Sequence, residues 1–253
     1  MTLESNSSEY STLASIYDKV MCHVQYDLWV NLINKITRRY CTGTDTSIFE
    51  IGGGTGVLGR SLKELGYKYY GSDLSFAMCK IAKERRDLPF FCANGTNLPV
   101  NKKFDLVIFL YDGINYLHTT NSFLSLYNEV FRILKPKGLF LFDVTTKFNS
   151  TNNFIDFLDY EDFGNFSYIR HSYFDKHTSC QYNEFTIYKQ KSKNSPLYYR
   201  YKEKHTQKVY PIHFLENTIP KKLFNKIGIW DGYSFNRYSS LSERVHFLLQ
   251  KSG

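Results

Sequence analysis

The stretch Ile48-Phe-Glu-Ile-Gly-Gly-Gly-Thr-Gly56 decides the fold of this chain. Its first residues predict a strand that ends in alternating glycines, and residues 55–65 then predict a helix that stops at Gly66. Glycines suit such a turn because the backbone must bend sharply and let a ligand approach within van der Waals contact. The N-terminus of the following helix offers unpaired N–H groups to a polar ligand. The stretch therefore predicts a loop that binds a nucleotide-type cofactor.

Three polar residues near this loop indicate which nucleotide cofactor it binds. The loop alone also satisfies the dinucleotide pattern G-x-G-x-x-G over residues 54–59, which is weak evidence by itself. Glu50 lies in the first strand, Asp73 closes a second predicted strand, and Asn94 follows a third. A carboxylate at the position of Asp73 can hold ribose hydroxyls. An acid, an acid and an amide at these positions resemble the S-adenosylmethionine (SAM) site of class I methyltransferases.

The resemblance extends beyond the loop. Residues 104–112 look like the fourth strand of that family, and residues 131–138 are similar to its R-x-L-K-P-G-G turn before a fifth strand at residues 139–144. The resemblance implies an α/β fold with SAM as cofactor: a doubly wound, mostly parallel seven-stranded Rossmann-like sheet with an antiparallel edge strand. The alternative is a NAD-binding oxidoreductase. It would leave Glu50 unexplained, and the sequence does not show the hydride-transfer residues that it needs.

The pattern along the chain indicates four parts. Residues 1–9 are expected to be disordered, and residues 10–40 show helical apolar spacing ahead of the first strand. Residues 48–144 alternate strand and helix, which is typical of a parallel sheet with helices on both faces. We expect an N-terminal helical lid over residues 1–44, a SAM-binding core over 45–148, an accessory antiparallel sheet over 149–210 and a C-terminal part over 211–253.

The accessory sheet is expected directly after strand five of the core. Three segments there alternate polar residues with Tyr, Phe, Ile and Thr, at residues 165–175, 180–190 and 198–210. Beyond them, residues 214–227 predict a helix that stops at Gly228. Two last strands, paired antiparallel at the edge of the main sheet, are predicted at residues 229–235 and 244–250.

The resemblance to the methyltransferases assigns roles to the residues around the cofactor. Glu50 would orient the loop or meet the SAM amino group. Asp73 would hold the ribose, although it also has the position of an N-cap for a helix that opens at Ser75. Leu74 would pack on the adenine, and Asn94, where the family more often has Asp, would hydrogen-bond the adenine edge. The remaining predicted contacts come from the loop and from two strand ends: Gly52, Gly53, Gly54, Gly56, Gly95 and Leu110.

Residues 17–29 carry a second resemblance. Tyr17 and Tyr26 each precede an aspartate, and Trp29 follows closely. This Y-D…Y-D-x-W pattern is similar to that of bacterial methyltransferases close to glycine N-methyltransferase and the amino-sugar N,N-dimethyltransferases. In those relatives an N-terminal helix covers the cofactor and its aromatic residues touch the methionyl end, where aromatic faces suit a sulfonium cation. The alternative is that the three side chains only pack the helix on the domain.

Methyl transfer from a sulfonium is an in-line displacement, so a protein chiefly aligns the reacting atoms and excludes water. An amine acceptor must be neutral, and a nearby carboxylate, tyrosine or histidine can take its proton. Asp112, at the mouth of the fourth strand, is the first candidate, with Tyr116 close behind; a turn-forming role before Gly113 is the alternative. His205 lies in an H-x-Q-x-Y-P stretch similar to one in the same methyltransferase group, and it is either a third candidate or a structural histidine.

The composition bounds the partners only loosely. The chain has 253 residues and a formal net charge of +8, from 32 Lys plus Arg against 24 Asp plus Glu. Such a charge favours phosphate-rich partners, and basic residues interleaved with tyrosines over residues 189–208 are compatible with RNA binding. We favour the simpler explanation, in which genome composition is biased and the lysines of an ordinary twisted strand point into water.

The leading hypothesis is a SAM-dependent methyltransferase of a small molecule, with N-methylation favoured over O-methylation, in a monomer or homodimer. An RNA methyltransferase is the alternative, and a SAM-binding protein without activity is a further one. No segment resembles a secretion signal or a membrane span, and the five cysteines have no zinc-binding or disulfide spacing. We therefore expect no metal, no membrane partner and a cytoplasmic location.

Overall fold

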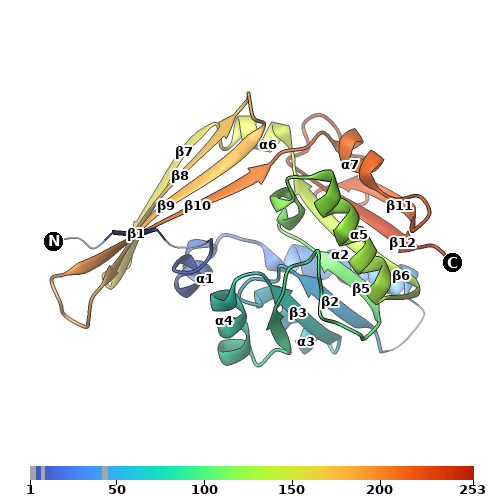
Figure 1. Cartoon of the computed structure of the whole chain (residues 1–253), viewed down its shortest axis with the longest axis horizontal. Coiled ribbons are helices and arrows are strands. Elements are labelled where there is room, and N and C mark those ends of the chain that lie inside the picture. Colours follow the sequence, from blue (N-terminus) through green and yellow to red (C-terminus); the bar gives the residue numbers. More distant parts are fainter. Residues whose placement is uncertain (1–3, 7–8, 42–44) are drawn as a thin grey trace.

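The computed structural model describes residues 4–6, 9–41 and 45–253, which form a central sheet and a separate accessory sheet (Figure 1). The central sheet has seven strands in the order β11-β12-β6-β5-β2-β3-β4. Its strands are β2 (Ser47–Ile51), β3 (Lys68–Asp73), β4 (Phe90–Cys92), β5 (Phe104–Phe109), β6 (Leu134–Thr145), β11 (Phe224–Asp231) and β12 (Arg244–Lys251).

The strand directions confirm the predicted fold class. The strands from β4 to β6 pair in parallel, whereas β12 pairs antiparallel with both β6 and the edge strand β11. The strand order reverses between β2 and β5, which start the two halves of the sheet. In an open α/β sheet a ligand binds at the carboxyl ends of the strands near such a reversal. The glycine loop after β2 and the residues after β5 both lie there.

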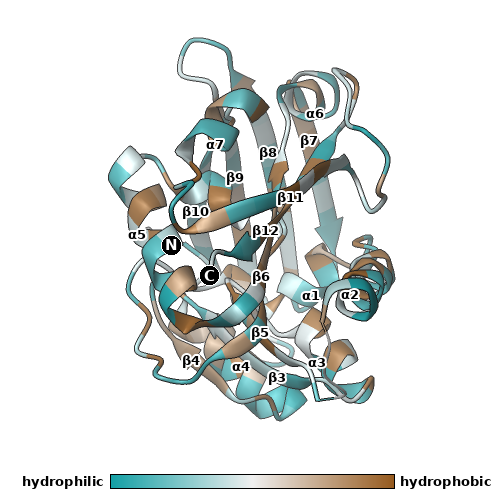
Figure 2. Cartoon of the chain, turned by 90° about the vertical axis from the view of Figure 1, so that its right-hand side faces the viewer, coloured by the Kyte–Doolittle hydropathy of each residue, from teal (hydrophilic) through white to brown (hydrophobic). Residues whose placement is uncertain are grey.

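Helices cover both faces of the central sheet. One face packs against α2 (Tyr26–Tyr40), α3 (Val57–Glu64) and α4 (Phe76–Arg86), and the other against α5 (Thr120–Ile133) and α7 (Ile212–Thr218). Successive side chains of a strand point to opposite faces, so Ile48 packs on the first group and Phe49 on the second. In Figure 2 the brown residues gather on β5, β6 and the helix sides turned toward them. Apolar side chains therefore fill the space between the sheet and the helices on both faces.

The accessory sheet follows β6 and the short helix α6 (Lys147–Asn152), as predicted. Four of its strands are antiparallel neighbours: β7 (Asp156–Asp162), β8 (Phe166–Asp175), β9 (Cys180–Gln190) and β10 (Tyr198–Lys208). The sequence predicted the last three and missed β7. That strand is rich in Asp and Glu, which are depleted in strands generally but protect the exposed edge of a sheet.

One end of the accessory sheet packs on the chain's N-terminal segment, by which we mean residues 9–25. This segment contains the short helices η1 (Leu13–Ser15) and α1 (Tyr17–Val20). Its apolar residues, such as Leu13, are buried against Tyr168 and Ile187 of the sheet. Figure 1 shows α1 between the accessory sheet and the core, so the segment joins the two.

Two predictions about element boundaries are wrong. The helix predicted over residues 214–227 is α7, which ends at Thr218, because Pro220 cannot continue a helix; β11 then begins at Phe224 instead of residue 229. Disorder over residues 1–9 is wrong for Glu4–Asn6, which form β1 parallel to β10. Residues 1–3 and 7–8 lie outside the described part of the chain.

The helices in the described part of the chain do not combine the length and apolarity that a membrane span needs. Helix α2 is the longest at 15 residues, and it presents charged side chains on one side.

Candidate active site

The glycine loop has the geometry that its sequence predicts. Gly52, Gly54 and Gly56 have φ angles of 65°, 56° and 82°, in the left-handed region where a Cβ atom is strained. A Cβ on Gly53 would lie only 2.9 Å from a carboxylate oxygen of Glu50. The loop therefore brings its backbone close to whatever lies above it, at the N-terminus of α3.

Asp73 fixes the position of this loop by hydrogen bonds to backbone N–H groups. Its Oδ2 accepts a hydrogen bond from the Gly54 N–H at 2.9 Å, and its Oδ1 accepts one from the Ser75 N–H at 2.8 Å. Burial raises the pKa of the carboxyl, while these N–H donors lower it. The N-cap predicted as an alternative belongs to Ser75, whose Oγ accepts from the Met78 N–H. Asp73 thus connects the ends of β2 and β3 with a fixed carboxylate.

Glu50 is a buried acid below the loop. Its side chain is 2% exposed and accepts a hydrogen bond from the Tyr69 hydroxyl. Burial raises the pKa of the Glu50 carboxyl to about 7, against the opposing effect of the Tyr69 hydrogen bond. At neutral pH the group is therefore poised between its neutral and ionised forms, and a nearby cation would favour ionisation.

The N-terminal segment is hydrogen-bonded to the glycine loop and to the N-cap of α4. Asp18 accepts hydrogen bonds from the Thr55 hydroxyl at 2.5 Å and from Arg86 at 2.6 Å, and Thr55 follows the loop glycine Gly54. The Ser75 hydroxyl donates to the Tyr10 carbonyl at 3.0 Å. Residues 10–18 therefore lie over the loop and over Asp73, where they can enclose a bound ligand.

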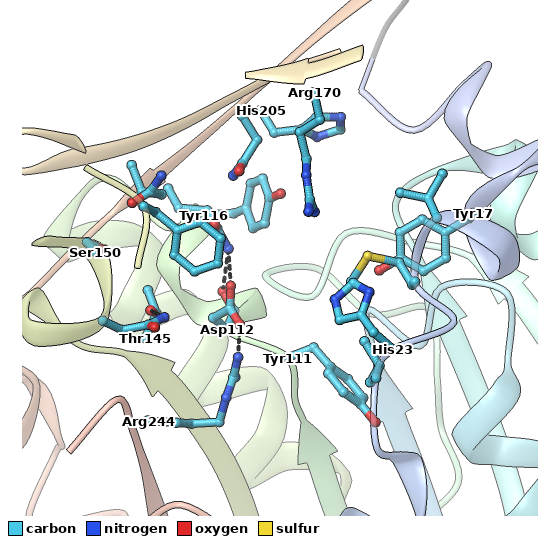
Figure 3. Close-up of a pocket in the computed structure, with 18 of the residues that line it drawn as sticks. Tyr17, His23, Tyr111, Asp112, Tyr116, Thr145, Ser150, Arg170, His205 and Arg244 are labelled. Carbon is cyan, nitrogen blue, oxygen red and sulfur yellow. Dashed lines mark hydrogen bonds and ion pairs between the residues drawn. The ribbon is translucent and has the colours of Figure 1, made fainter. Parts of the chain in front are cut away.

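A cavity of about 370 Å³ opens between three parts of the chain (Figure 3). Its floor is the carboxyl end of β5 and β6, with Tyr111, Asp112 and Thr145, and one wall is the N-terminal segment. Its roof is the accessory sheet. We use the word roof for the six cavity-lining residues of β8, β9 and β10: Arg170, Gln181, Asn183, Phe185, His205 and Gln207.

Asp112 stands at the floor of the cavity in a network of charges. Arg244 of β12 donates to Asp112 Oδ1 at 2.7 Å and also to Asp143, while Gln207 of the roof donates to Asp112 Oδ2. Asp143 is fully buried, and this burial raises the pKa of its carboxyl to about 6 despite Arg244. Both carboxylate oxygens of Asp112 are thus bound, and its side chain ties the floor to the roof.

The backbone at this point is strained. Tyr111 and Asp112 have φ angles of 59° and 52°, two successive non-glycine residues in the left-handed region. Such strain costs about 1 to 3 kcal/mol per residue and persists where surrounding contacts hold it. Here the Arg244 and Gln207 contacts hold it, so the floor of the cavity is kept in one shape.

Two tyrosines and a histidine meet on the other side of the cavity. The Tyr10 and Tyr116 hydroxyls lie 2.7 Å apart in a hydrogen bond, and the His205 ring lies 4.3 Å from the Tyr10 ring. Burial raises the pKa of both tyrosines well above its usual value, so both are phenols at neutral pH. His205 is 2% exposed, and neither ring nitrogen has a hydrogen-bond partner among the described residues. Glu203 Oε2 lies 3.6 Å from His205 Nε2.

Comparisons with known proteins agree with this arrangement. A methyltransferase domain model matches residues 48–138, which contain the glycine loop, Asp73 and the strained floor. The chain is 28% identical over 250 residues to the "Putative methyltransferase YqeM" of Bacillus subtilis, covering 96% of this chain and 97% of that protein. The chain is a class I SAM-dependent methyltransferase. Its cofactor is SAM, and the prediction of a methyltransferase over an oxidoreductase is confirmed.

Solved structures share the whole fold of this methyltransferase. A SAM-dependent methyltransferase from Clostridium acetobutylicum is 24% identical with a TM-score of 0.80, covering 96% of this chain and 99% of that one. The sugar N-methyltransferase KedS8 from Streptoalloteichus is 16% identical with a TM-score of 0.77, covering 100% and 99%. Both coverages include the accessory sheet, so the two-sheet arrangement recurs in these structures.

The structure of the methyltransferase separates the predicted aromatic residues. Tyr17 lines the cavity, and a Cβ on Gly54 would lie 3.9 Å from its ring. Tyr26 packs its ring 5.2 Å from that of Tyr111, which lines the floor. Trp29 is fully buried against Tyr233, one layer behind the cavity. Tyr17 is therefore the aromatic residue of the predicted set that faces the loop.

The predicted adenine contacts lie at the ends of β3 and β4. Leu74 is 68% exposed. The Asn94 Oδ1 accepts from the Thr96 N–H and hydroxyl, both at 2.9 Å, which leaves its NH₂ group as a donor. A Cβ on Gly95 would lie 2.7 Å from Ile51, so this glycine serves packing. Leu110 is 2% exposed and belongs to the core below the floor.

The sequence missed residues that reach the cavity from distant elements: Tyr10, Tyr111, Arg170, Gln181, Gln207 and Arg244. Four of them lie outside the segments that resembled the methyltransferase family motifs. A signal existed for two, because Tyr111 directly precedes the candidate Asp112, and Gln207 is the Q of the H-x-Q-x-Y-P stretch.

Proposed function

We propose that this methyltransferase transfers the SAM methyl group to the amine of a small-molecule acceptor bound under the roof. The observation that carries the proposal is the cavity itself, enclosed by floor, roof and N-terminal segment at the end of the sheet where a SAM methyl group would be presented. Its volume of about 370 Å³ is in the range of small-molecule sites. The likeness to KedS8, a sugar N-methyltransferase, supports an amine acceptor.

The cofactor would lie along the carboxyl ends of β2, β3 and β4. Asp73, already fixed by two N–H donors, would accept hydrogen bonds from the ribose hydroxyls with its remaining lone pairs. Leu74 and the Asn94 NH₂ would contact the adenine, and the glycine loop with Glu50 below it would receive the methionyl end. Tyr17 would cover the sulfonium, because an aromatic face attracts a cation.

The acceptor amine would lie near the paired hydroxyls of Tyr10 and Tyr116. In their hydrogen bond one hydroxyl donates to the other, so lone pairs remain that can accept from an amine N–H. Such a contact turns the nitrogen lone pair toward the methyl carbon, which is the alignment that this displacement requires. Asp112 is bound by Arg244 and Gln207, so we assign it a positioning role.

His205 is the residue we assign to accept the proton that the amine loses. Its two ring nitrogens have no hydrogen-bond partner in the described structure, and the ring contacts Tyr10. The Glu203 carboxylate, which also accepts from the Thr12 and Leu13 N–H groups, lies close enough to stabilise the imidazolium. The proton would pass from nitrogen to His205, directly or through a tyrosine hydroxyl.

The N-terminal segment would act as the lid of the cofactor site. Its contacts run through Asp18 to Thr55 and through Tyr10 to Ser75, so they cross the expected cofactor position. A bound SAM could leave only after these contacts open. This supports the expected division between a lid at the N-terminus and a SAM-binding core.

The nucleic-acid alternative gains no support from the basic strand. In β10 the buried residues Glu203 and His205 face inward, so Lys202 and Lys204, which alternate with them, point to the opposite face of the sheet. Lys204 there pairs with Glu184. The basic residues of this strand therefore do not lead into the cavity.

The test is a comparison of matched acceptors. Purified protein is incubated with labelled SAM and with pairs of small amines and the alcohols that replace the amine by a hydroxyl, and the methylated products are identified by mass spectrometry. We expect methylation at nitrogen. Methylated hydroxyls, or transfer to RNA alone, would contradict the proposal.

The variant His205→Gln tests the proton acceptor. We expect the turnover number to fall by about a hundredfold while S-adenosylhomocysteine binds as before, because general base catalysis contributes about that much. His213→Gln, at an exposed position of α7, is the control and should keep full activity. Equal turnover in both variants would remove His205 from the mechanism.

A further inference from the structure

The roof is polar because of the strand register, and this polarity bears on the acceptor. Across β8, β9 and β10 one row of paired positions holds Ser172, Asn183 and His205, and the next holds Phe174, Gln181 and Gln207. Alternation puts these rows on the same face as Arg170, two residues before Ser172. A buried face of this kind selects a polar ligand.

Arg170 is the charged residue of the roof. Its side chain is 12% exposed and comes from the middle of β8, and Figure 3 shows the guanidinium directed into the cavity. Asp159, its partner across the sheet, lies 3.0 Å from Nη2, and the ring of Phe157 lies 5.3 Å from the guanidinium carbon. Nε has no hydrogen-bond partner in the described part of the chain. An arginine has five N–H donors, so the guanidinium of Arg170 keeps donors for a ligand in addition to those that face Asp159.

The other charges around the cavity do not neutralise Arg170. Asp112 is the one carboxylate among the described residues that line the cavity, and Arg244 and Gln207 occupy its two oxygens. The second cation, Arg244, is bound by Asp112 and the buried Asp143. A ligand in the cavity therefore meets the guanidinium of Arg170 at the roof, whereas the oxygens of the lining carboxylate, Asp112, are already hydrogen-bonded.

Other roof atoms also lack partners. Gln181 is 4% exposed, and its Oε1 accepts no hydrogen bond from a described residue. The two ring nitrogens of His205 also have no hydrogen-bond partner among the described residues. The Oγ of Ser150, on α6 beside the roof, also has no hydrogen-bond partner among the residues that the structure describes. Buried polar atoms without partners cost free energy. Their concentration around one cavity indicates that a ligand supplies the missing partners.

We propose that the methyl acceptor carries an oxyanion, a carboxylate or a phosphate group, which binds Arg170 while its amine lies near Tyr10 and Tyr116. A guanidinium presents two parallel N–H donors that match the oxygens of either group. The inference rests on the proposed function and adds the substrate class. It makes Arg170 the residue that selects anionic amines over neutral ones.

The test uses oxyanions as probes of the roof. Acetate, inorganic phosphate and the neutral acetamide are titrated calorimetrically into the protein, with and without saturating S-adenosylhomocysteine. We expect both anions to bind and acetamide not to bind. Arg170→Gln should weaken anion binding by about tenfold, since hydrogen bonds to charged groups contribute about that much. The stronger of the two anions identifies the oxyanion as a carboxylate or a phosphate.

Three further variants sharpen the test. Arg170→Lys keeps the positive charge but loses the two parallel N–H donors of the guanidinium. Its affinity for the anions should therefore lie between those of the wild type and Arg170→Gln. Asp159→Asn removes the competing carboxylate and should strengthen anion binding. Lys204→Gln removes one charge from the opposite face of the same sheet and is the matched control, expected to bind as the wild type does.

The outcomes separate this inference from the proposed function. Unchanged binding of S-adenosylhomocysteine in Arg170→Gln shows that the variant is folded. If acetate binds no better than acetamide, or if Arg170→Gln leaves anion binding unchanged, the oxyanion inference is wrong although the methyltransferase stands. If the cofactor product does not bind the wild type, the proposed function fails, and the titrations without it still decide the role of Arg170.

Discussion

The central sheet and the accessory sheet bury their inner faces in different ways. In the central sheet both faces carry apolar side chains, such as Phe142, which stacks on Phe247 with ring centroids 4.7 Å apart. The accessory sheet buries an apolar end against the N-terminal segment and a polar end over the cavity, where Gln181 and His205 are as buried as core residues. The difference teaches that burial alone does not define a core: the apolar faces stabilise the fold, whereas the buried polar face is the one that we propose to bind the acceptor.

The largest expected effect tests this difference through stability. Phe142→Ala removes a fully buried ring from the central sheet and should lower the free energy of unfolding by about 3 to 5 kcal/mol. Gln181→Leu in the roof should change it by less than about 1 kcal/mol, because the loss of the unpartnered Oε1 offsets the loss of the Nε2 hydrogen bonds to the Tyr173 and Tyr182 carbonyls, both at 3.3 Å. Urea denaturation measures both. A roof variant as costly as the core variant would break the comparison.

The Arg244 network joins the two sheets, and removing it should have the second largest effect. Arg244→Gln leaves Asp112 and the buried Asp143 without their cation, which should cost about 2 to 4 kcal/mol of unfolding free energy at about pH 8. The Asp143 pKa is raised from 3.8 to about 6, so its contribution is present below its ordinary pKa and lost as pH rises through about 6. Without Arg244 that pKa rises further.

The cost of Arg244→Gln should therefore be larger at about pH 8 than at about pH 5, where Asp143 can protonate. Denaturation curves at the two values check this. Lys251→Gln, on the same strand but bound to backbone carbonyls and the Phe131 ring instead of a carboxylate, is the control and should show no such dependence. A cost for Arg244→Gln that does not change with pH would mean that Asp143 is not the charge it compensates.

The pH dependence of cofactor binding tests the role of Glu50, which lies in β2 of the central sheet. Its pKa is raised from 4.5 to about 7, so its contribution to stability is present below about 4.5 and lost as pH rises through about 7. A ligand ammonium beside it prefers the ionised form. The affinity for S-adenosylhomocysteine should therefore rise by about tenfold from about pH 5 to about pH 8.

In Glu50→Gln the affinity should not change over this range, because the amide does not titrate. Calorimetric titration at several pH values measures both proteins. If the wild type shows no rise, Glu50 only orients the glycine loop through its contacts with Tyr69 and Gly53, and it does not meet the amino group of the cofactor.

The smallest expected effect concerns the tyrosine pair that faces the roof. Tyr10→Phe removes the hydrogen bond to Tyr116 and should lower the free energy of unfolding by only about 0.5 to 1.5 kcal/mol. Its effect should fall instead on the turnover number, with affinity for S-adenosylhomocysteine retained. Tyr40→Phe, in α2 away from the cavity, is the control. A Tyr10 variant that loses stability but keeps its turnover would make the pair structural.

Sequence patterns predicted the parts of the fold that local chemistry controls. The glycine loop was recognisable because left-handed backbone strongly favours glycine, and Gly52, Gly54 and Gly56 lie close together in the chain. Core strands were recognisable because a buried strand is a short continuous apolar run. Where a local pattern was ambiguous the prediction was wrong, as in the apolar residues after Pro220 that continue as β11 and not as a helix.

What the sequence by itself determined is the class of fold, the cofactor loop and the order of the elements, since each depends on the spacing of residues close together in the chain. Only the tertiary structure decided which side chains share the cavity. Tyr10 meets Tyr116, 106 positions away, and Arg244 meets Asp112, 132 positions away. Strand register and the packing of the N-terminal segment determine these contacts, and neither produces a periodic pattern in the sequence. The cofactor could therefore be inferred from a motif, whereas our proposal for the chemistry of the acceptor rests on the polar end of the accessory sheet.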